Sequence, residues 1–207
     1  YQRASVAYVQ GKLAALVGSV FHTLTVIGIF PLFLLTLIGE DLFTTLFGVT
    51  WIEAGRYTQI LSPLSLLMFV GISLVLLPNI LGRQEGGLVF YGALFVVQLF
   101  ALWSGGVMGN ATLALFFLSV SSAVVWLLYF VWIFRHVGLS GRLVLVPLLP
   151  ATLLSSVLLG LLFVAMVMLQ LTGWLLLICS ILTCLIYYLA LIGLDSQMKE
   201  YSRPYLC

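Results

Sequence analysis

The chain has 207 residues, of which 63% are hydrophobic and only 7% are charged, with a formal net charge of +2 and a mean hydropathy of +1.26. Soluble domains carry about 25% charged residues, so this chain could not cover a water-facing surface. The composition therefore excludes a soluble protein and predicts an integral membrane protein. The eight basic residues are spread along the chain and form no basic patch, which argues against a nucleic-acid partner.

Six segments lack acidic and basic residues for long enough to cross a bilayer, and each predicts one transmembrane helix in an all-α fold. Each approaches or exceeds the ~20 residues that a membrane-crossing helix needs. The runs are too long and too uniformly apolar for the strands of a β-barrel. In chain order the predicted spans are 13–39, 57–82, 86–104, 111–134, 143–171 and 173–194, within a single transmembrane domain of residues 1–207.

The links between these spans differ in charge. Seven of the eight lysines and arginines fall in residues 1–12, the turn 83–85, the loop 135–142 and the C-terminal tail, whereas the opposite links carry only Arg56. Because cytoplasmic links are enriched in Lys and Arg, this pattern predicts that residues 1–12 and the C-terminal tail are cytoplasmic. Tyr187 and Tyr188 are then expected in the aromatic belt on the cytoplasmic side.

The external link 40–56 carries charge and ends in the pattern TWIEAGRY. Gly48 predicts a turn, and Thr50 is a candidate cap for a helix that follows. Glu53 would lie in the favourable first turn, and Arg56, three residues later, could pair with it on the same face. The pattern therefore predicts an amphipathic entry into the second span.

Polar residues inside the spans allow a structural or a functional interpretation. His22 is ionisable and lies in the first span, where it would form a structural hydrogen bond or line a cavity. Gln59 and Ser62 share a helical strip with Ser65, and such a strip either joins helices or lines a wet cavity. Arg83, in the turn LGRQEGG, is either a cytoplasmic anchor or a phosphate contact.

Residue patterns for enzyme chemistry are missing from the sequence. No carboxylate pair, Ser–His pair or cluster with metal-ligand spacing lies at one predicted membrane depth. No phosphate-binding Gly-Lys-Ser/Thr loop is present, so use of ATP by this chain is not expected. The sequence therefore predicts a non-enzymatic protein with no catalytic residues, no metal site and no cofactor.

The segment LFGVTWIEAGRYTQILSPLSLLMFVGISLVLLPNILGRQEGGLVF (46–90) resembles a recurring block in bacterial polysaccharide-export flippases. These belong to the multidrug/oligosaccharidyl-lipid/polysaccharide exporter superfamily. Family members often carry a Phe-Gly, a Trp shortly after it, an Ala-Gly, a span with Leu and Pro, and a Gly-Arg/Lys-Gln turn. The residues that match are Phe47-Gly48, Trp51, Ala54-Gly55, Leu61-Ser62-Pro63 and Gly82-Arg83-Gln84.

The resemblance implies an architecture of two six-helix bundles around a central cavity, in some members with two additional C-terminal helices. The six spans would be helices nine to fourteen of fourteen, which form part of the second bundle and the two C-terminal helices. The N-terminal bundle is then expected to be absent from this chain. Alternating access in such a transporter requires both bundles.

The implied function is transfer of a polyprenyl-pyrophosphate-linked oligosaccharide across the bacterial inner membrane for surface polysaccharides such as lipopolysaccharide O-antigen. The expected partners are the lipid-linked oligosaccharide, membrane lipids, a polysaccharide polymerase and other assembly proteins. Two alternatives stay open, a drug or small-molecule antiporter of the same fold and a membrane assembly subunit without transport activity. The candidate substrate-binding residues are Arg56, Arg83, His22, Gln59 and Ser62.

Overall fold

The computed structural model describes residue 8 and residues 11–202, with the side chains of the last helix described as far as residue 193. This part of the chain is helical and contains no strand. Arg3 and Arg203, and most of the predicted cytoplasmic ends, lie outside the described residues. The long helices are α2 (Leu13–Phe47), α3 (Ile52–Gly71), α5 (Gln84–Val107), α6 (Ala111–Val137), α8 (Leu149–Met168) and α9 (Gly173–Ser202).

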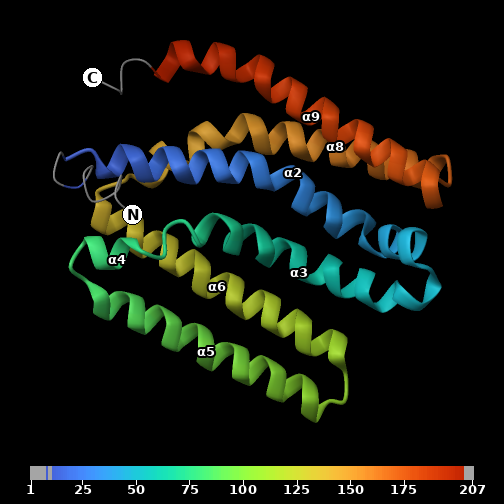
Figure 1. Ribbon diagram of the computed structural model, residues 1–207, viewed down its shortest axis with the longest axis horizontal. Helices are drawn as coiled ribbons and strands as arrows, with labels where there is room; N and C mark the ends of the chain where they lie inside the picture. Colours follow the sequence, from blue (N-terminus) through green and yellow to red (C-terminus); the bar gives the residue numbers. More distant parts are fainter. Residues whose placement is uncertain (1–7, 9–10, 203–207) are drawn as a thin grey trace.

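These helices run back and forth along one direction, and the turns between them alternate between two ends of the molecule (Figure 1). Helix α3 packs between α2 and α6, and α5 forms a hairpin with α6. The α8–α9 hairpin contacts α2 on the other side. The links predicted to share a side, at 83–85 and 135–142, do lie at the same end of the molecule (Figure 1).

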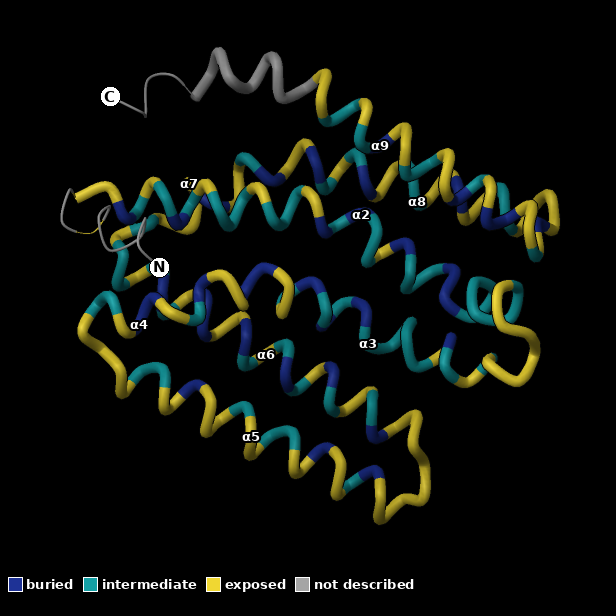
Figure 2. The backbone as a smooth tube through the Cα atoms, in the orientation of Figure 1, coloured by how far each residue is buried: buried dark blue, intermediate teal, exposed yellow. Residues whose placement is uncertain are grey.

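The chain is an all-α polytopic membrane protein. Five helical segments within the described residues are long and apolar enough to cross a bilayer, namely Leu13–Phe47, Gln84–Val107, Ala111–Val137, Gly141–Met168 and Gly173–Gly193. Helix α3 has 20 residues but is less apolar, because it contains Glu53, Arg56 and several hydroxyl groups. Figure 2 shows exposed positions along α5 and α9, and many carry large apolar side chains that suit contact with lipid.

The link after the first span is shorter than the sequence predicted. Helix α2 continues through Glu40 and Asp41 to Phe47, so the link contains only Gly48 and the 3₁₀ turn η1 (Val49–Trp51). Gly48 has a φ of 96°, which confirms the predicted glycine turn. Thr50 does not cap α3, because the N-cap is Trp51 and no side chain bonds there. Glu53 lies in the first turn of α3, as predicted.

Prolines divide two of the predicted spans. The span 57–82 contains α3 and then the short α4 (Leu77–Ile80), with Pro78 near the start of α4. The span 143–171 contains α7 (Gly141–Leu145), the 3₁₀ turn η2 (Val146–Leu148) and α8, with Pro147 in η2. Proline has no backbone N–H to donate to the carbonyl four residues earlier, so the hydrogen-bond ladder of a continuous helix is interrupted at these points.

Two hydrophobic cores share α2. The first core joins the N-terminal half of α2 to α3, α4, α5 and α6, and its largest side chains are Phe90, Trp126, Tyr129 and Phe130. The second core joins the C-terminal half of α2 to α8 and α9 around Phe30, Leu176 and Tyr187. Because no water enters hydrocarbon, such cores are held mainly by close packing and interhelical hydrogen bonds.

Glycines permit the closest approaches between helices. A Cβ atom built on Gly71 would overlap the Trp126 ring, and one built on Gly105 of α5 would overlap the backbone of Ala114 in α6. By contrast, a Cβ atom on Gly106 would meet no atom within 4 Å. Two adjacent glycines of α5 therefore differ in whether they face the neighbouring helix.

We expect Gly105→Ala to lower the free energy of unfolding by about 1–3 kcal/mol, because the added methyl group must displace the Ala114 backbone. Gly106→Ala is the matched control, and it should change the free energy by less than about 1 kcal/mol. Equilibrium unfolding of the chain in lipid bicelles measures both. Equal effects of the two substitutions would contradict the packing of α5 against α6.

Candidate functional site

The predicted site residues on α3 lie beside a close crossing of α2 and α3. A Cβ atom on Gly55 would lie 2.6 Å from the Cα atom of Glu40 and 2.7 Å from the carbonyl oxygen of Gly39. A Cβ atom on Gly39 would lie 2.9 Å from the carbonyl oxygen of Gly55. The two backbones therefore touch, in the manner of small-residue interfaces between transmembrane helices.

Arg56 follows this crossing and binds two carboxylates. Its Nε donates to Oε2 of Glu40 at 3.1 Å, and its Nη1 donates to Oε1 of Glu53 at 3.0 Å. The pKa of Arg56 is raised above its usual value, first by the hydrogen bond to Glu40 and then by the charges of Glu40 and Glu53. The predicted pairing with Glu53 is confirmed, whereas no sequence pattern predicts the contact with Glu40, 16 residues away.

The Arg56 side chain is 48% exposed and lies at the end of the molecule that holds the α2–α3 link (Figure 1). A guanidinium group has five N–H donors in a planar fork that matches carboxylate and phosphate oxygens. Exposed ion pairs contribute little stability, because water and salt screen them. An incoming anion could therefore replace a carboxylate partner of Arg56 at small cost.

Gln59 and Ser62 lie further along α3 and bond to backbone carbonyls. Nε2 of Gln59 donates to the carbonyl oxygen of Leu37 in α2 at 3.2 Å. Ser62 is buried and donates to Thr58 of its own helix at 2.6 Å. Gln59 therefore bonds α3 to α2, and the hydroxyl of Ser62 is satisfied within α3.

His22 and Arg83 lie away from this crossing. Nε2 of His22 is 3.2 Å from the carbonyl oxygen of Pro147, and since a carbonyl only accepts, that nitrogen carries the hydrogen. His22 thus bonds α2 to the segment that leads into α8. Arg83 is the exposed N-cap residue of α5 and forms no ion pair with a described residue. It lies at the end of the molecule opposite Arg56 (Figure 1).

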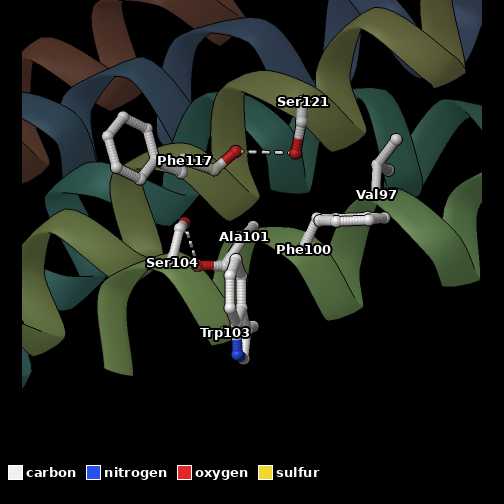
Figure 3. A pocket seen from close by; sticks show the side chains of 7 residues that line it. All are labelled: Val97, Phe100, Ala101, Trp103, Ser104, Phe117 and Ser121. Atoms are coloured by element: carbon white, nitrogen blue, oxygen red, sulfur yellow. Dashed lines mark hydrogen bonds between the residues drawn. The ribbon is translucent and has the colours of Figure 1, made fainter. Parts of the chain in front are cut away.

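A groove of about 450 Å³ lies between α5 and α6, and none of the five candidate residues lines it. The hydroxyls of Ser104 and Ser121 donate to carbonyls of their own helices, at 2.9 and 2.7 Å (Figure 3). The wall of the groove is therefore almost entirely apolar. Its lining residues are Val97, Phe100, Ala101, Trp103, Ser104, Phe117 and Ser121.

The described residues contain no group of three or more His, Cys, Asp or Glu side chains that could hold a metal ion. Comparison of the chain with protein-family models, with curated proteins and with solved structures finds no match. The geometry of the α2–α3 crossing is therefore the main structural guide to function.

We expect Gln59→Met to lower the free energy of unfolding by about 1 kcal/mol, because α3 loses a hydrogen bond to the Leu37 carbonyl. Gln98→Met on α5 is the matched control, since Gln98 makes no hydrogen bond with a described residue. Unfolding of both variants in bicelles tests the assignment. A cost for Gln98→Met as large as that for Gln59→Met would contradict it.

Proposed function

We propose that the chain is part of a flippase that moves a polyprenyl-pyrophosphate-linked oligosaccharide across a bacterial inner membrane. The resemblance of residues 46–90 to polysaccharide-export flippases is the starting point. Its matching residues lie at turns and close helix contacts, including Gly48 with a φ of 96° and Gly82 with a φ of 67°. The helical polytopic architecture is also what such a transporter requires.

The observation that carries the proposal is the exposed Arg56 between Glu40 and Glu53. In the proposed cycle, a pyrophosphate arriving at the external end displaces one carboxylate and binds the guanidinium as a fork. The displaced carboxylate would repel the bound anion and favour its release. The crossing at Gly39 and Gly55 would keep Arg56 in place during this exchange.

The distribution of charge supports a cytoplasmic location for the end that carries Arg83. Lys12, Arg83, Arg135 and Arg142 lie at or near this end, together with Glu85 (Figure 1). The opposite end carries Arg56 and three acidic residues, which are Glu40, Asp41 and Glu53. Lysine and arginine enrichment marks the cytoplasmic side, so we place Arg56 outside the cell and Arg83 inside.

Reporter fusions test this orientation. A fusion after residue 84 should be active only with a reporter that works in the cytoplasm, and a fusion after residue 108 only with one that works in the periplasm. Because α5 alone separates the two positions, opposite activities follow if it spans the bilayer. Activity of one reporter type at both positions would contradict the orientation and the span.

Complementation of a deletion strain tests the proposed function. In the full-length protein, Arg56→Gln should lower the amount of surface polysaccharide about tenfold, because a charge-assisted bond to phosphate is lost. Arg56→Lys keeps the charge but loses the fork and should fall between Arg56→Gln and the native protein. Arg83→Gln tests the cytoplasmic contact, and Arg135→Gln, another exposed arginine at that end, is its control.

The three hypotheses predict different outcomes for this strain. Loss of surface polysaccharide with accumulation of lipid-linked oligosaccharide on the inner leaflet supports the flippase. Drug sensitivity with normal polysaccharide would instead identify an antiporter. Deletion of an assembly subunit would also cause polysaccharide loss, but export would not depend on Arg56 or Arg83. Full export by both Arg56→Gln and Arg83→Gln would exclude these two residues from the proposed site.

A further inference from the structure

Pro31 interrupts the hydrogen-bond ladder of α2 in the middle of the membrane-crossing part. The helix continues from Leu13 to Phe47 with Pro31 inside it, and it bends part-way along its length (Figure 1). Proline has no N–H, so the carbonyl of Ile27, four residues earlier, lacks its usual partner within the helix. Hydrocarbon offers no water to replace that donor.

Two tyrosines of α9 supply donors at this point. Oη of Tyr188 donates to the freed carbonyl of Ile27 at 2.8 Å, and Oη of Tyr187 donates to the adjacent carbonyl of Val26 at 2.7 Å. The ring of Tyr187 also stacks on Phe30, the residue before the proline, with centroids 4.7 Å apart and an interplanar angle of 16°. We name Tyr187 and Tyr188 the tyrosine clamp.

These contacts differ from the sequence prediction for the two tyrosines. Tyr187 is fully buried and bonded to α2, so it does not lie in an aromatic belt at the membrane surface. A belt tyrosine would present its hydroxyl to headgroups or water. Here the hydroxyls of both residues point instead to the backbone of another helix.

The bend also separates the two cores. Leu13 and Val17, before Pro31, belong to the first core with α3 and α6, whereas Leu34 and Ile38, after it, belong to the second core with α8 and α9. The C-terminal half of α2 also contacts α3, at the Gly39–Gly55 crossing, so the core changes along α2 while the contact with α3 continues. Pro31 therefore lies at the point of α2 where one core gives way to the other.

We propose that Pro31 is a hinge in α2 and that the tyrosine clamp holds it in the bent conformation. The α8–α9 hairpin then acts as a brace that sets the direction of residues 32–47. These residues carry Gly39 and Glu40, so the hinge also sets the direction of the α2–α3 crossing and of Arg56. This inference goes beyond the proposed function and holds whether or not the protein is a flippase.

A second site in the chain shows the same arrangement. Pro78 lacks the N–H that would bond the carbonyl of Leu74, and Oη of Tyr129 in α6 donates to that carbonyl at 3.0 Å. There Leu74 also accepts from the N–H of Leu77 at 3.0 Å, so Tyr129 is not its sole donor. At Pro31 the missing N–H is the one that would normally bond Ile27, and Tyr188 brings a donor to that carbonyl from another helix.

A double-mutant cycle between Pro31 and Tyr188 tests the chemical basis of the clamp. Tyr188→Phe should lower the folding equilibrium constant in bicelles about tenfold, because it leaves the Ile27 carbonyl without a donor. In the Pro31→Ala background the alanine N–H can bond Ile27, so the same change should cost less than about threefold. Tyr91→Phe is the control, because the Tyr91 hydroxyl has no partner among the described residues.

Equal costs of Tyr188→Phe in the two backgrounds would overturn the clamp. A second measurement covers the case in which Pro31→Ala does not fold. Spin labels at Ser19 and Leu46, two exposed positions on either side of Pro31, report the bend of α2 by pulsed dipolar spectroscopy after the native cysteines are replaced. We expect one narrow distance distribution in the native protein.

The variant with both Tyr187→Phe and Tyr188→Phe should then show a broader distribution or a second distance, because the freed hinge samples other angles. Tyr91→Phe should leave the native distribution unchanged. A double variant with the native distribution would overturn the hinge, even if its stability were lower, because the tyrosines would then stabilise α2 without setting its direction.

Discussion

The constraint on which this structure most depends is that a backbone carbonyl inside hydrocarbon needs a hydrogen-bond donor from the protein. A regular helix supplies that donor itself, and each proline removes one. The chain places prolines within or between its apolar helices and brings hydroxyl groups from neighbouring helices to nearby carbonyls. Tyr188 donates to Ile27 and Tyr129 donates to Leu74, the carbonyls that lose a donor at Pro31 and Pro78, at 2.8 and 3.0 Å. Ser119 of α6 adds a hydrogen bond to the Ile60 carbonyl of α3 at 2.8 Å. These polar contacts join helices that apolar packing alone would orient less uniquely.

A second consequence of the lipid environment is that charge gathers at the helix ends. Glu40, Glu53 and Arg56 lie together where α2 meets α3, and the glycine contact between Gly39 and Gly55 makes their approach possible. Packing and electrostatics thus act at the same place. The arrangement leaves an arginine that is held in position but still half exposed, which is the property that a transient anion contact needs.

The sequence predicted the features that depend on local chemistry. Composition and charge-free runs identified the helices, Gly48 identified a turn with positive φ, and the spacing of Glu53 and Arg56 identified their pairing. The sequence could not predict contacts that depend on how helices pack. The charge of Glu40 predicts the end of a helix, but α2 continues to Phe47. Tyr187 is predicted in an aromatic belt, but it is buried against α2.

Magic-angle-spinning NMR of the labelled chain in lipid bilayers tests the central constraint most directly. It resolves whether the carbonyl carbon of Ile27 lies beside the Tyr188 ring or beside water. We predict a cross-peak between the Ile27 carbonyl carbon and Cζ of Tyr188, a carbonyl chemical shift typical of a hydrogen-bonded group, and no magnetisation transfer from water. Magnetisation transfer from water to the Ile27 carbonyl, without a cross-peak to Tyr188, would contradict this prediction. The carbonyl would then be hydrated, and the lack of water in the bilayer would not explain the bond from Tyr188.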